Sequence, residues 1–159
     1  MKTIQNHLQK QGCIFIAMFI SIASFGQDET PATKNLIEAQ LYTFKAQTAN
    51  PASGGIRQLT SEYDLKISKD TVIAYLPYFG RAYSGPVDLT GGGINFTSMQ
   101  FEYNVSRGKN NRWKIIIKPK DANDVQELSL TVFENGKADL YVRSNNRQPI
   151  SFNGYIAGR

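Results

Sequence analysis

Apolar and polar residues alternate along most of the chain after residue 60. Such a period of two predicts β-strands with one buried face. Two-residue turn signals separate several of these runs, at Lys69-Asp70, Asn110-Asn111 and Asn135-Gly136, and the Asn-Gly pair is the strongest short hairpin signal. The apolar positions of the runs are Tyr63, Leu65 and Ile67; Met99, Phe101, Tyr103 and Val105; Trp113, Ile115 and Ile117; Leu128, Leu130 and Val132; and Ala138, Leu140 and Val142.

Two further runs, at residues 71–76 and 150–155, complete a mainly β pattern. We predict about eight short antiparallel strands in a meander, forming a small barrel or a two-layer sandwich, with Trp113 buried. Strand pairing decides between barrel and sandwich, and the alternation does not show it. Residues 71–76 are apolar on both faces, so we expect cover on each, from an N-terminal helix or from the aromatic segment that follows.

The region before residue 60 carries weaker patterns. Residues 35–47 fit both a helical and a strand period, and we predict a short helix to about Gln40, followed by a strand. Residues 27–34 are polar and include Pro31, which favours a flexible leader. Residues 50–55 have the composition of a loop. The predicted single β domain therefore covers residues 35–159.

The first 26 residues have the three parts of a secretory signal peptide. Lys2 and Lys10 precede an apolar run at residues 13–25, and Ser24-Phe25-Gly26 offers small residues for cleavage after Gly26. The apolar run is shorter than the roughly 20 residues of a spanning helix, so no transmembrane segment is expected after cleavage. Cys13 begins the apolar run instead of following it, which excludes a lipoprotein. We expect a periplasmic or secreted protein.

Cleavage of the signal peptide changes which reactive side chains, and how much net charge, the mature protein has. Removing 26 of 159 residues leaves 133, and the only cysteine (Cys13) and the only histidine (His7) leave with the signal. Disulfides, thiol nucleophiles, histidine triads and the usual zinc sites are thereby excluded, and no cofactor or metal is expected. The charge falls from 18 basic against 13 acidic residues to 16 against 13. A net charge near +3 does not favour nucleic-acid binding.

One aromatic segment, LPYFGRAY at residues 76–83, stands out as a candidate binding site. Tyr and Arg side chains combine rigid apolar area with hydrogen-bonding ends, which suits ligand contacts. Alternatively, these rings plug one end of the barrel, and Arg81 bonds loop carbonyls. Arg147 lies in the polar segment 145–149, which is interpreted as a turn because Asn tolerates left-handed backbone geometry; Arg147 is also a candidate to join Arg81 in binding a carboxylate or a sugar. The candidate ligand-binding residues are Tyr78, Phe79, Arg81, Tyr83 and Arg147.

Two other features have simpler interpretations. Gly91-Gly92-Gly93 lacks the lysine-serine pair and the following helix of a phosphate-binding loop, and it is interpreted as a flexible linker. The basic side chains Arg112, Lys114, Lys118 and Lys120 share one strand face, where Glu102 and Glu127 of neighbouring strands offer partners. We interpret this face as solvated.

Four segments together resemble a known family. YTFKAQTANP (42–51), LPYFGRAY (76–83), INFTS (94–98) and NRQPISFNG (146–154) are similar to the recurring segments of the domain of unknown function 4251 family, small exported proteins of the Bacteroidetes. The resemblance implies export and a single domain. It carries over no catalytic residue, because no activity or ligand is established for the family.

These observations lead to one main hypothesis and two alternatives. The main hypothesis is an exported, non-catalytic binding or accessory module of the cell envelope, whose partner is an unknown small ligand or an envelope protein. One alternative is a protein-interaction or assembly factor that uses a sheet edge or the aromatic segment. The other is a carboxylate-dependent hydrolase, which requires two acids that face one cleft.

Overall fold

One helix precedes nine strands in the computed structural model, which describes residues 30–83 and 92–158. The predicted signal peptide, residues 1–26, lies outside the described residues. The elements are α1 (Thr30–Ala39), β1 (Tyr42–Pro51), β2 (Arg57–Ile67), β3 (Val72–Leu76), β4 (Ile94–Ser98), β5 (Phe101–Arg107), β6 (Trp113–Pro119), β7 (Val125–Val132), β8 (Lys137–Ser144) and β9 (Ile150–Gly158).

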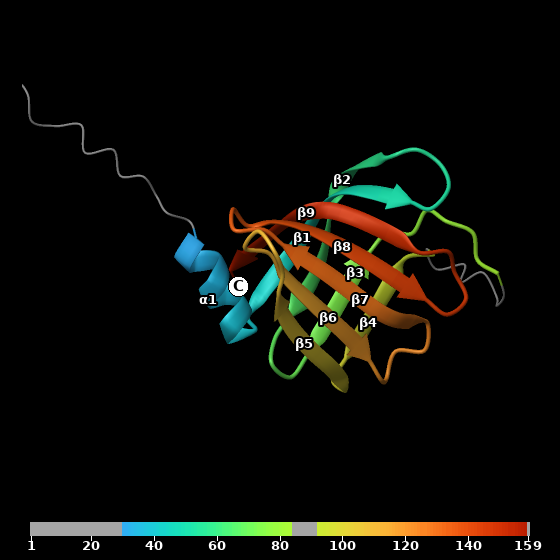
Figure 1. Ribbon diagram of the computed structural model, residues 1–159. Coiled ribbons are helices and arrows are strands. Elements are labelled where there is room, and N and C mark those ends of the chain that lie inside the picture. The colour runs from blue at the N-terminus through green and yellow to red at the C-terminus, as the bar shows by residue number, and fades with distance from the viewer. Residues whose placement is uncertain (1–29, 84–91, 159) are drawn as a thin grey trace, which may run out of the picture.

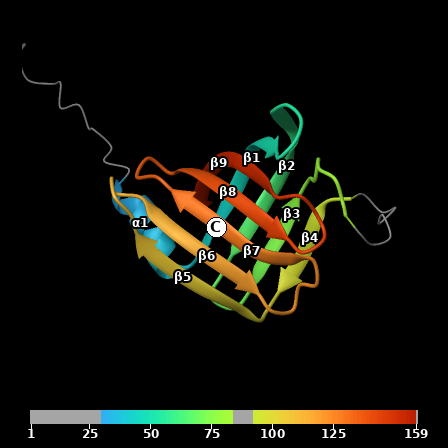
Figure 2. The same cartoon turned by 45° about the vertical axis from the view of Figure 1, so that its right-hand side comes forward.

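The nine strands form one antiparallel sheet in the order β4-β3-β2-β1-β9-β8-β7-β6-β5 (Figure 1). Two meanders, β1 to β4 and β5 to β9, are joined where the first strand pairs with the last, from Tyr42↔Gly158 to Pro51↔Ile150. The sheet curls into a nearly closed barrel (Figures 1 and 2). The predicted mainly β antiparallel fold with one short helix is confirmed; the architecture is a barrel, and the strands number nine instead of about eight.

Alternation places the core inside the barrel, as the period of two predicted. In β8, Ala138, Leu140 and Val142 are buried, while the residues between them are exposed. Trp113 is 6% exposed, which confirms the prediction that it is buried.

The three predicted hairpin turns are also present. Ile67 pairs with Val72 around Lys69-Asp70, Val132 pairs with Ala138 around Asn135-Gly136, and Gly108 N–H donates to Arg112 around Asn110-Asn111. Gly136 has a φ of 78°, a conformation that glycine adopts without strain.

Two residues of the predicted alternation do not join the core. Met99 is 71% exposed because it lies in the turn between β4 and β5. Val105 is 45% exposed because β5 is the last strand of the sheet, with a neighbour on one side only. A residue on an end strand has fewer neighbours to cover it than one in the middle of the sheet.

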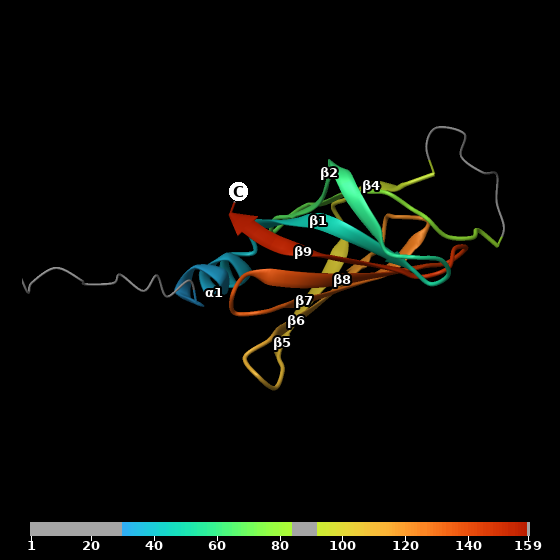
Figure 3. The ribbon, with the colours of Figure 1, turned by 90° about the horizontal axis from the view of Figure 1, so that it is seen from above.

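The helix α1 begins at Thr30, five residues before the predicted start, so residues 30–34 are helical and the prediction of a flexible leader is wrong there. Pro31 does not prevent this, because the N–H groups of a first turn have no helical acceptor to lose. The Thr33 hydroxyl donates to the Glu134 carbonyl at 3.2 Å, and Ile37 is 2% exposed. The helix therefore lies against the barrel end at which β9 finishes (Figure 3).

Within the described part of the chain, no helix combines the length and the apolar composition needed to cross a bilayer.

The outer face of β3 is open, which corrects the expectation that both faces of this strand are covered. Val72, Ala74 and Leu76 point into the core, but Tyr75 is 53% exposed and stacks on Tyr63, with ring centroids 5.6 Å apart. The helix, one of the two elements expected to cover this strand, instead lies across the barrel end. Stacking between two tyrosines of neighbouring strands provides partial cover in its place.

The basic face of β6 is solvated and paired, as predicted. Lys120 lies 3.0 Å from Glu102 of β5, and Lys118 lies 3.9 Å from Glu127 of β7. Such pairs of opposite charge are typical cross-strand contacts.

The barrel has a seam where the sheet order ends, because β4 and β5 do not pair with each other. Side chains join the elements there. The Asp121 carboxylate accepts hydrogen bonds from the Ser98 hydroxyl, from Met99 N–H at 2.9 Å and from Gln100 N–H at 3.2 Å. Asp121 thereby ties the β6–β7 connection to the turn between β4 and β5.

Candidate functional site

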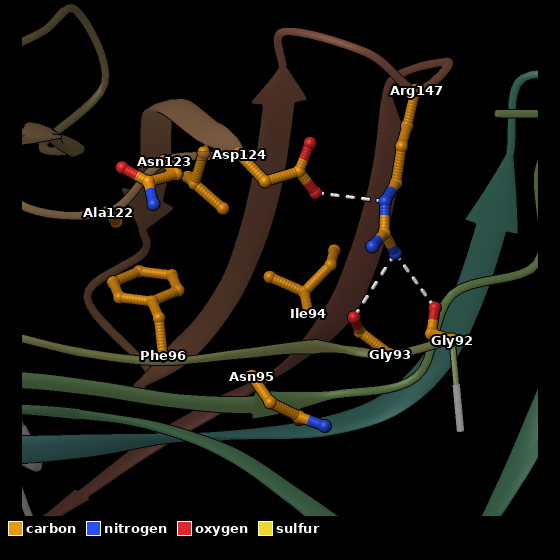
Figure 4. Close-up of a pocket in the computed structure, with 10 residues that line it drawn as sticks. Gly92, Gly93, Ile94, Asn95, Phe96, Ala122, Asn123, Asp124 and Arg147 are labelled. Atoms are coloured by element: carbon orange, nitrogen blue, oxygen red, sulfur yellow. Dashed lines mark hydrogen bonds and ion pairs between the residues drawn. The ribbon is translucent and has the colours of Figure 1, made fainter. Parts of the chain in front are cut away.

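A pocket of about 230 Å³ opens at the seam, between β4 and the connection from β6 to β7 (Figure 4). None of the described strands pairs with this side of β4, so residues of the β6–β7 connection, the start of β7 and the β8–β9 loop form the opposite wall. The residues that line the pocket are Gly92, Gly93, Ile94, Asn95, Phe96, Ala122, Asn123, Asp124, Val125 and Arg147.

Arg147 joins three segments at this pocket. From the β8–β9 loop, its Nη1 donates to the carbonyls of Gly92 at 2.8 Å and Gly93 at 3.1 Å. Its Nε lies 2.9 Å from Oδ2 of Asp124, and its guanidinium carbon lies 5.2 Å from the centre of the Tyr78 ring. With a side chain only 20% exposed, Arg147 is held by charge-assisted hydrogen bonds and by an aromatic face.

The third nitrogen of this guanidinium is oriented differently. Nη2 makes no hydrogen bond or ion pair with any residue that the structure describes, and it faces the pocket (Figure 4). An arginine carries five N–H donors in a rigid fork, and two of them belong to Nη2. The pocket therefore has a fixed, charged donor at its edge.

Apolar side chains form the remaining surface of the pocket. The Phe96 ring and Ile94 lie between β4 and the 122–125 segment, and the Asn123 amide lies beside that ring (Figure 4). Asn95 points away from Arg147 and Asp124 in the same view. The site thus combines a charged donor, a carboxylate and one amide with an aromatic face.

A glycine allows the carbonyls to approach Arg147. A Cβ added to Gly93 would lie 2.8 Å from the Leu76 carbonyl oxygen, which is closer than real Cβ contacts come. The backbone at Gly93 therefore packs directly on β3, and this position holds both acceptor carbonyls toward Arg147.

The structure brings two of the five predicted site residues together. Tyr78 lies beneath the Arg147 guanidinium, and its hydroxyl is 3.0 Å from both the Arg81 and the Gln148 carbonyl oxygens, to which it donates. Burial raises the pKa of the Tyr78 hydroxyl, and the nearby charge of Arg147 acts in the opposite direction. The Tyr78 ring packs against the Arg147 guanidinium, and Tyr78 does not line the pocket.

The other three predicted site residues lie outside the pocket. The Phe79 ring packs under the Arg57 guanidinium at 4.8 Å, on the side of β2. Arg81 and Tyr83 have exposed side chains, and it is their backbone that is bonded: Gln148 N–H donates to Arg81, and Tyr83 N–H donates to Asn146. The Arg81 side chain does not join Arg147: it is exposed, and the residue whose backbone pairs with that of Arg147 is Ala82.

Sequence reasoning missed Asp124, Asn123 and Phe96. Asp124 and Asn123 belong to a polar turn between two strands, and Phe96 belongs to a short strand, so neither context marks them as functional. Gly92 and Gly93 were interpreted as linker, although their carbonyls bind Arg147. The contact between an arginine and a glycine run is the signal that defines the site. Arg147 and Gly92 are 55 positions apart, so the sequence does not show that they meet.

The ionisable groups of the pocket lining are few and already paired. Among the described residues that line the pocket, Asp124 is the one acid, and it already pairs with Arg147. A glycosidase-type mechanism needs two carboxyl groups that flank one bond. In the described part of the chain, no group of three His, Cys, Asp or Glu side chains is placed to hold a metal ion.

The fold and this site define a class: a small, nearly closed antiparallel barrel with a helix at one end and a polar pocket at its seam. The chain belongs to the family described as Domain of unknown function (DUF4251), whose profile matches residues 26–156.

A solved structure has a similar fold. It is the crystal structure of a DUF4251 family protein from Bacteroides eggerthii DSM 20697, with a TM-score of 0.61 and 15% sequence identity. The match covers 82% of this chain and 87% of the other. No curated protein matches the sequence.

Proposed function

We propose that this protein is an exported, non-catalytic binding module of the cell envelope that takes a small, neutral, polar ligand in the seam pocket. The observation that carries the proposal is Arg147, whose Nε and Nη1 are bonded within the protein while Nη2 faces the pocket. A donor that is fixed before the ligand arrives loses little conformational entropy on binding.

The charges of the pocket favour a neutral ligand. Asp124 neutralises Arg147 and would repel a ligand carboxylate. A bidentate carboxylate contact needs two guanidinium nitrogens, and two of the three already bond described residues. A carbonyl or hydroxyl oxygen fits beside Nη2. A ligand O–H or N–H fits beside the second oxygen of Asp124, and an apolar ligand face fits on Phe96. A ligand with two neighbouring hydroxyl groups, or with an amide, offers both the acceptor and the donor.

The size of the pocket limits the ligand. Its volume of about 230 Å³ lies below the usual range for drug-sized ligands, roughly 300–1,000 Å³. A single sugar ring or a short amide is therefore a better fit than a large cofactor.

A thermal-shift screen tests this proposal. Protein without residues 1–26 would be heated with monosaccharides, N-acetylated sugars and small peptidoglycan fragments, because a ligand of the native state raises the unfolding midpoint. Replacing Asn123 with alanine should leave the midpoint of the free protein unchanged and reduce the shift. Asn104→Ala, an exposed asparagine on β5 outside the pocket, is the matched control. A shift that survives Asn123→Ala and Phe96→Ala, or no shift with any probe, would contradict the proposal.

Export has its own test. We expect a mature protein that begins at Gln27, in the periplasm or outside the cell. The support is the basic start, Lys2 and Lys10, and the small residues of the predicted cleavage site, Ser24-Phe25-Gly26. N-terminal sequencing of protein from the envelope fraction should find Gln27 first. An intact Met1 in that fraction would disprove cleavage.

One observation favours a second candidate function, protein interaction through a sheet edge. Among the described strands, β5 pairs with β6 only, and its Val105 side chain is 45% exposed, so this edge can accept a strand of another protein. A charged residue on an edge opposes such pairing. If this function holds, Val105→Lys should release an envelope protein that otherwise copurifies, while the unfolding midpoint stays the same.

A further inference from the structure

A second concave region lies on the outer wall of the barrel, away from the seam. It consists of two hollows, of about 690 Å³ and about 250 Å³, that share Gln47 and Tyr155 and therefore meet. We call the combined feature the wall groove. It crosses β2, β1, β9 and β8, which lie side by side in the sheet (Figure 1).

A break in the β1 ladder lies at the junction of the two hollows. The register of β1 shifts between Ala46 and Thr48, so Gln47 is an extra residue, and its side chain is exposed. A Cβ at Gly154 of β9 would overlap the Lys45 carbonyl, so only glycine fits opposite the bulge. Bulges re-aim side chains and are common beside binding sites. Here the bulge directs Gln47 to the middle of the wall groove.

Hydrogen bonds hold the polar side chains of the larger hollow in place. Thr48 Oγ1 donates to Asn153 Oδ1 at 3.1 Å, and Asn153 Nδ2 donates to Asp139 Oδ1 at 2.7 Å. This chain of contacts crosses β1, β9 and β8 on the exposed surface. It leaves further acceptor and donor positions of Asp139 and Gln47 for a ligand.

Aromatic rings are spread along the groove. Tyr63 lines the smaller hollow, Phe133 lines the larger one, and Tyr155, which is 41% exposed, lines both. Aromatic faces flanked by amides and carboxylates suit sugar rings, whose C–H faces pack on the aromatic and whose hydroxyls bond the polar groups. Tyr63 also stacks on Tyr75, and the Arg112 guanidinium carbon lies 5.1 Å from the centre of the Phe133 ring, so Tyr155 is the ring on which the sugar contact chiefly depends.

The charges of the groove balance. The described charged residues of its lining are two lysines, Lys45 and Lys137, and two acids, Glu62 and Asp139. Lys45 pairs with Glu62 at 3.3 Å and with Asp64 at 3.7 Å. A polyanion gains little from such a surface. An extended peptide also lacks its main binding mode here, because all four strands already pair on both sides.

We propose that the wall groove binds a neutral, linear glycan of several sugar rings. The inference is independent of the seam pocket, with which the groove shares no lining residue. Each hollow binds part of the glycan, and Tyr155 contacts the sugar ring at the junction of the two hollows.

Calorimetric titration tests this assignment. The purified protein would be titrated with maltohexaose, cellohexaose and hexa-N-acetylchitohexaose, with the corresponding disaccharides, and with hexagalacturonate as an anionic comparison. At least one neutral hexasaccharide should bind, and its disaccharide should bind at least about tenfold more weakly, because it spans one hollow. Tyr155→Ala should weaken hexasaccharide binding about tenfold without lowering the unfolding midpoint.

Two controls separate the groove from other surfaces. Tyr141→Ala removes a tyrosine of nearly equal exposure, 43%, that lies outside the groove, and it should leave binding unchanged. Asn123→Ala, in the seam pocket, should also have no effect. The proposal is overturned if no neutral hexasaccharide binds up to about 10 mM. It also fails if Tyr155→Ala binds as the parent does, if the disaccharide binds equally well, or if hexagalacturonate binds as tightly as the neutral chains.

Discussion

The barrel is closed by two different means on its two sides. Where β1 meets β9, nine residue pairs form a backbone ladder from Tyr42↔Gly158 to Pro51↔Ile150. At the seam, β4 and β5 end the sheet without pairing, and the side chains of Arg147 and Asp121 connect the elements instead.

This difference explains where the two candidate sites lie. On the ladder side the backbone bonds fill the space between strands, and the wall groove lies over the place where the β1 ladder is disturbed, at Gln47. At the seam no ladder is present, and the pocket is the space that the connecting side chains leave. We therefore expect the ladder side to be sensitive to backbone fit, and the seam to be sensitive to the loss of single side chains.

The largest effect is expected on the ladder side. Gly154→Ala places a methyl group against the Lys45 carbonyl and should destabilise the protein by about 3 kcal/mol, since an overpacked core costs this much when backbone must move. Gly158→Ala, in the same strand, is the control, because its Cβ would meet Leu36 at an ordinary 3.6 Å. Chemical denaturation measures both. Equal stability of the two variants would show that β1 shifts freely at the bulge.

A smaller effect is expected at the seam. Arg147→Ala removes the bonds to Asp124 and to two glycine carbonyls and should cost about 2 kcal/mol, as expected for charge-assisted hydrogen bonds. Arg81→Ala is the matched control: its side chain is exposed, and the change should stay within about 0.5 kcal/mol. Denaturation midpoints compare the two. A loss at Arg81 as large as that at Arg147 would mean that the aromatic segment, and not Arg147, holds the seam.

The smallest effect should depend on pH. The hydrogen bond from Ser98, followed by that from Met99 N–H, lowers the pKa of Asp121 below its ordinary value of 3.8. A carboxyl group whose pKa is lowered by folding stabilises the protein above its ordinary pKa and loses this contribution as the pH falls through the folded value. Asp121→Asn should therefore lower the melting temperature at pH 7, and the difference from the parent should shrink below pH 3.8.

Parallel melting curves between pH 7 and pH 2 measure this difference. A constant gap across that range would show that the charge of Asp121 does not contribute to closing the seam.

The sequence predicted the strands better than it predicted the site. Hairpins such as that at Asn135-Gly136 depend on neighbours in the chain, so a local pattern is enough to find them. Tyr78 and Arg147 were identified as candidates because Tyr and Arg often bind ligands, and the structure brings the two side chains together. Phe79, Arg81 and Tyr83 belong to the same aromatic segment but lie elsewhere, because the chain bends at Gly80: Phe79 packs under Arg57, and the other two side chains are exposed.

Helix α1 shows the limit of composition as a guide. Residues 30–34 are polar and include a proline, yet they are helical because tertiary contacts hold the helix: Ile37 enters the core and Thr33 bonds Glu134. Packing of one apolar face stabilises a helix more than the preferences of its residues do. The polar composition of residues 30–34 therefore does not predict whether they belong to the folded domain.

The alternation, the turn residues and the apolar positions were sufficient to determine a mainly antiparallel β domain with Trp113 inside, because each depends on residues close in the chain. Only the tertiary structure decided that β1 pairs with β9, that β4 and β5 stay apart, and that Arg147 meets Gly92 across 55 positions. These contacts join segments with no sequence relation to each other. A period of two says which way a side chain points, and it does not say which strand lies beside it.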